Sequence, residues 1–185
     1  MMLRKNGSAT GHFDDFSSNT IANYTEYASV GSASWSISGG LLVAANSIAS
    51  SPQSILTRNG VSFSDGTAGI VITRADDAGV ALRVLNQSNY YCANVYDASS
   101  GSGVTNQVRL YKRVSGSFTQ LGSTQTISFT RNTAHTLEIV ASGTTISLKF
   151  DGVTKISVTD SSLSSGKCGP RTNAGTTNID SFTCP

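Results

Sequence analysis

Hydrophobic and polar residues alternate with a period of two along most of the chain. The run from Thr145 to Phe150 shows it clearly, because Ile146, Leu148 and Phe150 share one face while polar residues occupy the other. Successive side chains of a strand point to opposite faces, so this pattern predicts a half-buried strand. No stretch of a dozen residues shows the apolar spacing of an amphipathic helix. The chain is therefore predicted to be all-β.

Similar runs recur at short intervals, separated by turns rich in Gly, Asn, Asp and Ser. Ser142-Gly143 and Asp151-Gly152 are expected hairpin connections, in which glycine permits a positive φ. A single sheet of so many strands would curl or split, so an antiparallel two-sheet β-sandwich is expected. The predicted strands are 13–16, 35–37, 41–43, 55–58, 69–74, 80–85, 90–96, 108–113, 118–121, 126–129, 137–141, 145–150, 153–158, 168–171 and 178–184.

The order of several short motifs resembles that of a known family. These motifs are FDDF at 13–16, WSISGGL at 35–41, ISLKFDG at 146–152 and NIDSF at 178–182. In order and spacing the chain resembles the concanavalin A-like lectin/glucanase superfamily, and within it a laminin-G-like jelly-roll domain. The resemblance covers residues 13–185 and implies one jelly-roll domain there. Residues 1–12 are polar and have no strand pattern, so they are predicted to form an N-terminal arm.

That superfamily contains glycosidases, lyases and non-catalytic modules that bind glycans or proteins. Its glucanases carry their catalytic carboxylates in a Glu-x-Asp-x-x-Glu strand, and this sequence has no such motif. Its only two glutamates, Glu26 and Glu138, lie far apart in the chain. Because glycoside hydrolysis needs two carboxyl groups at one bond, we do not expect an enzyme.

Composition narrows the set of partners. Only 13% of residues are charged, the net charge is +2, and Ser and Thr together account for 51 of the 185 residues. The basic residues are scattered rather than clustered, so nucleic acid is not an expected partner. No window approaches the roughly 18 apolar residues of a membrane span, so no membrane association is expected.

Strand alternation also predicts a ligand face. If Tyr91, Ala93 and Val95 face the core, their neighbours along the strand emerge on the opposite side. The residues that this argument places on one outer face are Arg83, Tyr90, Asn94, Tyr96, Arg109 and Tyr111. Tyr stacks on sugars, and Arg and Asn bind hydroxyl groups, but Tyr and Arg are also enriched at protein interfaces. A glycan site, a protein interface and an ordinary sheet surface remain the three alternatives.

No cofactor is expected, and no catalytic or metal-ligating set is assigned. The acidic residues Asp14, Asp15, Asp76, Asp77 and Asp180 leave Ca²⁺ open as an alternative, since laminin-G-like domains often bind it. The competing interpretation is that these carboxylates cap turns and strand ends.

The chain has three cysteines. Without an export signal they are expected to be reduced. The alternative is a disulfide between Cys168 and Cys184, because a hairpin centred on residue 176 would place the two opposite each other. Cys92 is then expected to be a small buried residue.

The first functional interpretation is a non-enzymatic surface protein of a virion, either a phage capsid decoration or a tail component. The arm has only Met1, Met2 and Leu3 as large apolar residues. Ordering costs roughly 1–2 kcal/mol per residue, so the arm is predicted to pack on other virion or assembly proteins. The outer face would then adhere to a cell-surface glycan. The alternative is a carbohydrate-binding module excised from a secreted, extracellular glycan-degrading enzyme.

Overall fold

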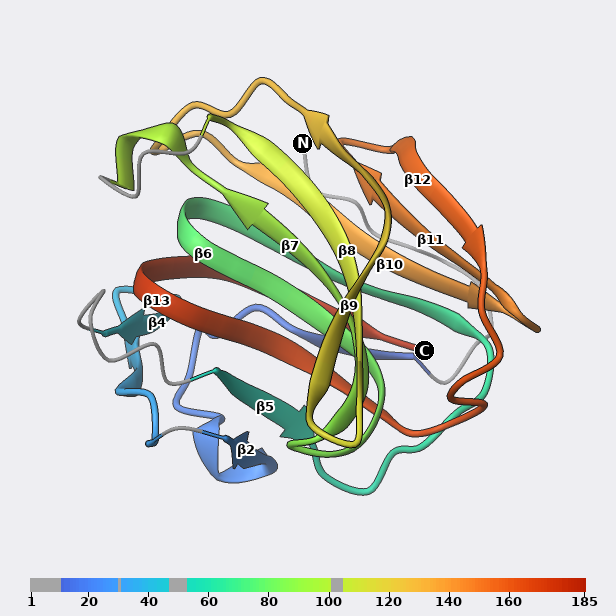
Figure 1. Ribbon diagram of the computed structural model, residues 1–185. Helices are drawn as coiled ribbons and strands as arrows, with labels where there is room; N and C mark the ends of the chain where they lie inside the picture. The colour runs from blue at the N-terminus through green and yellow to red at the C-terminus, as the bar shows by residue number, and fades with distance from the viewer. Residues whose placement is uncertain (1–10, 30, 47–52, 101–104) are drawn as a thin grey trace.

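The computed structural model describes residues 11–29, 31–46, 53–100 and 105–185 (Figure 1). These ranges form strands and two short 3₁₀ turns, η1 (Ile21–Asn23) and η2 (Ala98–Ser100), but no α-helix. The strands are β1 (His12–Asp14), β2 (Tyr24–Ala28), β3 (Trp35–Ser38), β4 (Leu41–Ala45), β5 (Ser54–Arg58), β6 (Gly66–Asn86), β7 (Asn89–Tyr96), β8 (Gln107–Val114), β9 (Ser117–Thr126), β10 (His135–Ser142), β11 (Thr145–Phe150), β12 (Val153–Thr159) and β13 (Lys167–Cys184). The all-β prediction is confirmed.

The strands pack in two antiparallel layers. Layer 1 has the order β9-β8-β7-β6-β13-β5-β2, and layer 2 has the order β12-β11-β10-β6-β13-β4-β3, with β1 paired to the end of β13. Strands β9, β8 and β7 of layer 1 lie against β12, β11 and β10 of layer 2. The predicted two-sheet sandwich is therefore also confirmed.

The two long strands β6 and β13 run from one layer into the other. The first part of β6 pairs with β10 in layer 2, and its last part pairs with β7 in layer 1. The register between β6 and β13 shifts around Thr172–Thr177, where Gly175 has a φ of 68°. Bulges and a left-handed glycine bend strands, so the pair turns the corner between layers here. The predicted strands 69–74 and 80–85 are thus one strand, as are 168–171 and 178–184.

Residues 173–178 therefore form a bend within β13, and the hairpin predicted at residue 176 is wrong. The predicted strand 126–129 also differs, because β9 ends at Thr126 and the chain then leaves the sheet. Strand β2 was not predicted from the sequence. Its central residue Glu26 accepts hydrogen bonds from Ala33 N and Ser54 Oγ, at 2.9 and 2.5 Å. The polar side chain of this strand residue therefore binds neighbouring segments of the chain.

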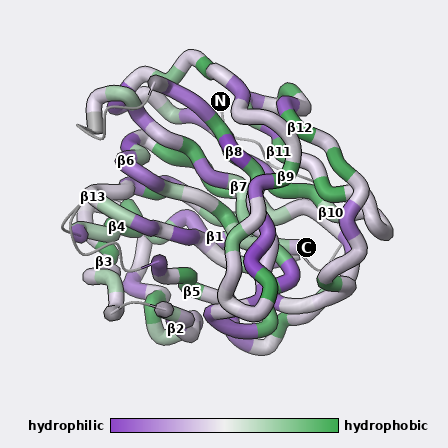
Figure 2. Tube along the Cα trace, viewed as in Figure 1, coloured by the Kyte–Doolittle hydropathy of each residue, from purple (hydrophilic) through white to green (hydrophobic). Residues whose placement is uncertain are grey.

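The core lies between the layers, where alternate residues of the facing strands meet. Leu82, Ala93 and Leu110 of layer 1 pack in one cluster with Ile139 and Leu148 of layer 2, and all five are fully buried. Hydrophobic and hydrophilic positions alternate along these strands (Figure 2). Burying a large aliphatic side chain contributes about 1.5–3 kcal/mol, so this cluster holds the sandwich together.

Of the predicted arm, residues 1–10 lie outside the described residues. His12, assigned to the arm from the sequence, is instead the first residue of β1 and pairs with Cys184. No helix in the described part of the chain is long and apolar enough to cross a membrane.

Candidate functional site

The outer face of layer 1 gathers arginine, tyrosine and amide side chains from four adjacent strands. The β-ladder places Arg171 of β13, Gly79 of β6, Asn94 of β7 and Arg109 of β8 in one row across the sheet. We call this surface the arginine face and define it by Asp77, Tyr90, Asn94, Tyr96, Arg109, Tyr111, Arg113, Lys167, Arg171 and Asn173. Five of the six residues predicted from alternation belong to it.

The arginine face is concave. Three strands separate β9 from β13 in layer 1, which would be about 19 Å in a flat sheet at about 4.8 Å per strand. The guanidinium carbon of Arg171 nevertheless lies 6.0 Å from the ring centroid of Phe118 on β9. Arg113 Nη1 of β8 likewise donates a hydrogen bond of 3.1 Å to Gln53 Oε1, just before β5. The sheet therefore curls around the centre of the face.

Arg83 does not belong to this face, which corrects the sequence prediction. It has a φ of 51°, and the β6–β7 register shifts between Leu82 and Asn86. This bulge turns Val84 onto the outer side, where it packs with Tyr90. The Arg83 side chain is buried and donates to the carbonyls of Ser64, Leu163 and Gly143 and to the Asp65 carboxylate.

Arg83 therefore links loops at the edge of the sandwich. It also lines a surface pocket of about 280 Å³ together with Ser64, Asp65 and Leu163. Because its donors are already bound by the protein, this pocket offers no free guanidinium to a ligand.

Tyr90 and Asn94 lie on the predicted face but form its buried floor rather than its surface. Tyr90 is fully buried, and only 2% of Asn94 is exposed. Phe118 packs edge-on against both Tyr90 and Tyr111, with centroids 6.1 Å apart in each case. Tyr96, Arg109 and Tyr111 are half-buried and form the rim.

A buried carboxylate lies at the centre of the floor. Asp77 accepts hydrogen bonds from Asn94 Nδ2 at 3.0 Å and Asn173 Nδ2 at 2.6 Å, and its Oδ1 is 3.9 Å from Arg171 Nη1. Burial raises the pKa of Asp77, and the nearby Arg171 charge and the amide hydrogen bonds oppose that rise. Burial lowers the pKa of Arg171, but the acidic groups around it, Cys92 first, raise this pKa by a larger amount. The net result is a pKa above the ordinary value of arginine. Asp77 thus holds two amides by hydrogen bonds and lies beside one guanidinium.

Gly79 makes room for this arrangement. A Cβ there would lie 2.4 Å from the Ala93 carbonyl oxygen and 2.9 Å from Asn94 Oδ1. Only glycine therefore lets the Asn94 amide lie across β6 to reach Asp77.

Several polar atoms of the arginine face have no protein partner. Among the described residues, eight buried side-chain nitrogen or oxygen atoms lack a hydrogen bond, and six of them belong to this face. They are Tyr90 Oη, Asn94 Oδ1, Arg109 Nε, Arg171 Nε, Arg171 Nη1 and Asn173 Oδ1. Buried polar groups are nearly always bonded in native proteins, so this concentration marks a place where a ligand or water completes the network.

The rim holds its arginines over aromatic rings. The guanidinium of Arg109 lies 4.9 Å from the centroid of Tyr96, and its Nη1 donates to Tyr111 Oη at 3.2 Å. Arg113 lies 4.9 Å from the centroid of Phe118. Such stacking fixes the plane of a guanidinium. The Nε and Nη1 atoms of Arg113 already donate to Gly116 O, Gln53 Oε1 and Gln87 O.

The acidic residues considered for Ca²⁺ are dispersed, and most are already bound by protein groups. Asp14 bonds Phe16 N and the Tyr24 hydroxyl, and Asp76 pairs with Arg74 and Arg131. Within the described ranges, no three His, Cys, Asp or Glu side chains are placed to hold a metal ion.

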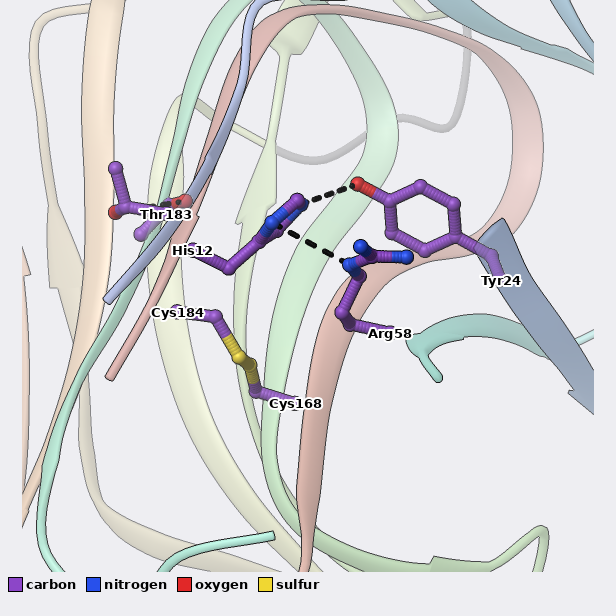
Figure 3. The surroundings of a disulfide bond; sticks show 7 residues. His12, Tyr24, Arg58, Cys168, Thr183 and Cys184 are labelled. Carbon is purple, nitrogen blue, oxygen red and sulfur yellow. Dashed lines mark hydrogen bonds between the residues drawn. A yellow bond between two sulfur atoms is a disulfide. The ribbon is translucent and has the colours of Figure 1, made fainter. Parts of the chain in front are cut away.

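A disulfide joins Cys168 to Cys184 (Figure 3). The two Cα atoms are 6.3 Å apart although both residues lie on β13, 16 positions from each other. The bend in β13 accounts for this, because Cys168 lies in layer 1 and Cys184 in layer 2. The bond therefore crosses the core between the layers. Cys92 is buried in the floor of the arginine face and is not disulfide-bonded.

Neither glutamate lies on the arginine face. Glu26 is bound to Ser54 and Ala33, and Glu138 lies on β10 opposite Lys149 in layer 2. In the part of the chain that the structure describes, Asp77 is the one carboxylate of the face.

Alternation predicted the β7 members of the site and two of its three β8 members, Arg109 and Tyr111, and missed the β13 members. Arg171 and Asn173 were assigned to a strand end and a turn, because the bend that carries them onto the face has the composition of a hairpin loop. Asp77 was considered only as a Ca²⁺ ligand. Arg113 was also missed, although it shares the alternate positions of Arg109 and Tyr111 on β8, which is the signal that could have added it.

The chain matches no protein-family model, and no curated protein matches it. Solved structures do resemble it. Carbohydrate-binding module CBM66 from Bacillus subtilis superposes with a TM-score of 0.71 at 20% identity, over 88% of this chain and 96% of that one. The chain has a concanavalin A-like jelly-roll fold. The predicted resemblance in fold is confirmed.

Two other structures agree with this fold. A Bacillus subtilis protein of unknown function with a galectin-like fold gives a TM-score of 0.67 at 10% identity, over 97% of both chains. A Bacillus licheniformis β-glucanase gives 0.64 at 9% identity, over 96% of this chain and 99% of that one. At such identities the likeness concerns the fold, which binding modules and hydrolases share, so function has to be argued from the site.

Proposed function

We propose that this chain is a non-catalytic carbohydrate-binding module that holds its glycan on the arginine face. The observation that carries this proposal is the set of six buried, unpaired polar atoms that belong to that face. Four are donors, from Tyr90, Arg109 and Arg171, and two are amide acceptors, from Asn94 and Asn173. A sugar hydroxyl both donates and accepts a hydrogen bond, so neighbouring hydroxyls of a glycan complement this mixture.

The shape of the face supports the same function. The concave floor is flanked by the half-buried Tyr96 and Tyr111, so aromatic surface lies beside polar groups. In ligand sites the aromatic surface supplies contact area, and the polar groups fix the orientation of the ligand. CBM66, whose fold this chain shares, is itself a carbohydrate-binding module. The single carboxylate of the face, Asp77, is engaged by Asn94 and Asn173, so the pair of carboxyl groups that hydrolysis needs is not assembled there.

The disulfide favours an oxidising location. Disulfides persist outside the cell and are rare in the cytosol, so the Cys168–Cys184 bond fits the secreted, extracellular alternative. A virion protein anchored through residues 1–12 stays a prediction, because nearly all of that arm lies outside the described residues.

Binding to a panel of polysaccharides, measured by affinity electrophoresis, tests the proposal. We expect the wild-type protein to be retarded by at least one glycan, and Arg109→Ala and Tyr96→Ala to weaken that binding about tenfold. Lys149→Ala removes a charge from layer 2 and serves as the control, with binding unchanged. Failure of every glycan to bind, or equal binding by the two face variants and the wild type, would contradict the proposal.

A second measurement tests the absence of catalysis. The release of reducing ends from the bound polysaccharide should stay at background. Turnover that disappears in Glu138→Gln would show a carboxylate acting as general acid or base and would overturn the non-catalytic assignment.

A further inference from the structure

The charges of the arginine face are strongly unequal. Its described charged side chains are the basic Arg109, Arg113, Lys167 and Arg171 and the acidic Asp77. Four of the thirteen basic residues of the chain thus share one concave surface, although the whole chain carries a net charge of only +2. The low overall charge therefore hides a local excess of positive charge.

Protein carboxylates do not neutralise this excess. Elsewhere in the described part of the molecule, Arg74, Arg83, Lys112 and Arg131 each form an ion pair with an aspartate. The basic residues Arg58, Lys149 and Lys155 of that part are dispersed and form none. On the arginine face, Arg171 reaches Asp77 at 3.9 Å, whereas no carboxylate of the described residues lies within 4.0 Å of the other three basic groups. The residues outside the described ranges include no Asp or Glu at all, so they hold no carboxylate side chain that could pair with these cations.

Two arginines of the face carry guanidinium nitrogens that have no protein partner. Arg171 is 97% buried, with its Nε and Nη1 atoms unpaired, and Arg109 has an unpaired Nε. A guanidinium presents parallel N–H groups that match the oxygens of a carboxylate or sulfate, and these charged hydrogen bonds are about twice as strong as neutral ones. A neutral sugar would satisfy the hydrogen bonds but leave the charge excess uncompensated.

We propose that the arginine face selects an acidic glycan, one whose sugars carry carboxylate or sulfate groups. This inference rests on the proposed carbohydrate-binding function and adds the class of ligand. The acidic group takes the guanidinium edges of Arg109 and Arg171, and the hydroxyls take the amides of Asn94 and Asn173. Asp77 is held by those amides and by Arg171, so it anchors the floor and does not neutralise the rim.

Matched pairs of probes test the selection. Polygalacturonate is compared with its methyl ester, and dextran sulfate with dextran, so each pair differs only in the acidic group. Isothermal titration is expected to give about tenfold tighter binding of at least one acidic member than of its neutral partner. The double variant Arg109→Gln/Arg113→Gln should lose that preference, while Lys149→Gln/Lys155→Gln, which removes the same charge from layer 2, should retain it.

Circular dichroism establishes that each variant is folded before binding is compared. Tight binding of neutral members that the face variant abolishes would overturn the acidic selection and leave carbohydrate binding intact. No binding of these probes or of the neutral panel would overturn both proposals. Equal loss in the two double variants, or equally tight binding of a single-stranded oligonucleotide, would show general attraction to anions and overturn the selection.

Discussion

Two buried or partly buried aspartates show how a single side chain is tuned by its surroundings. Burial raises the pKa of Asp77, and its amide and guanidinium neighbours offset that rise only in part. Burial also raises the pKa of Asp160, but hydrogen bonds from Lys112, Tyr91 and Ser162 more than compensate, so this pKa lies well below its ordinary value. Asp160 is therefore bound far more strongly as a carboxylate than as the protonated acid.

This contrast predicts a pH dependence of stability. Lys112 Nζ donates to Asp160 Oδ2 at 2.5 Å, and the Tyr91 hydroxyl donates to Oδ1 at 2.6 Å. Because the folded pKa is lowered, Asp160 stabilises the protein above its unfolded pKa of about 4, and this contribution is lost as the pH falls below that value. Asp160→Asn should therefore be less stable than the wild type in urea near pH 7, with a difference that narrows near pH 3. A difference that stays constant over this range would contradict the assignment.

Residue-level alternation succeeded where the backbone is regular and failed where it is not. Tyr96 and Arg109 lie where a period of two places them, since β7 and β8 pair without interruption along those positions. Arg83 fails because its positive φ reverses the alternation, and a bulge leaves no mark in the hydrophobic pattern. Arg171 shows the same limitation. The side of the sheet on which it lies depends on the bend in β13, and the residues of that bend have the composition of a hairpin turn.

At the scale of the element, β6 and β13 determine the architecture. Each supplies residues to both layers, and their common bend carries Arg171 and Asp77 onto one concave face. Gly169 shows how tightly β13 is held, since a Cβ there would lie 1.8 Å from the Leu56 carbonyl oxygen. The sequence predicted the halves of both strands but not their continuity, because the contacts that bend them are distant in sequence.

The disulfide constrains this bent strand and should contribute measurably to stability. Its loop spans 16 positions, for which the loss of chain entropy on cross-linking predicts about 3 kcal/mol. Cys168→Ala/Cys184→Ala should lower the free energy of unfolding in urea by about this amount. Dithiothreitol should destabilise the wild type but leave the double variant unchanged. Equal stability of oxidised wild type and double variant would contradict a structural role for the bond.

At the scale of the whole molecule, the arginine face and strand β1 lie on different layers. The arginine face belongs to layer 1, whereas β1 adds to β13 within layer 2 through His12, Phe13 and Asp14. Arg58 Nε donates to His12 Nδ1 at 3.3 Å, and His12 Nε2 lies 3.2 Å from the Tyr24 hydroxyl (Figure 3). The stability supplied by β1 and the affinity supplied by layer 1 should therefore be separable.

Truncation from the N-terminus tests this separation. Removing residues 1–14 deletes β1 and takes Asp14 from the buried Tyr24 hydroxyl, which donates to it at 2.9 Å. An unpaired buried hydroxyl costs about 1–3 kcal/mol, so this variant should unfold at lower urea concentration than the full chain. Removing residues 1–10 retains β1 and is the matched control, with a much smaller effect expected.

Both variants should keep wild-type glycan affinity below their unfolding transitions, because β1 contributes nothing to the arginine face. Equal destabilisation by the two truncations would place the stabilising contacts in residues 1–10, and loss of affinity in the folded 11–185 chain would place part of the binding site there.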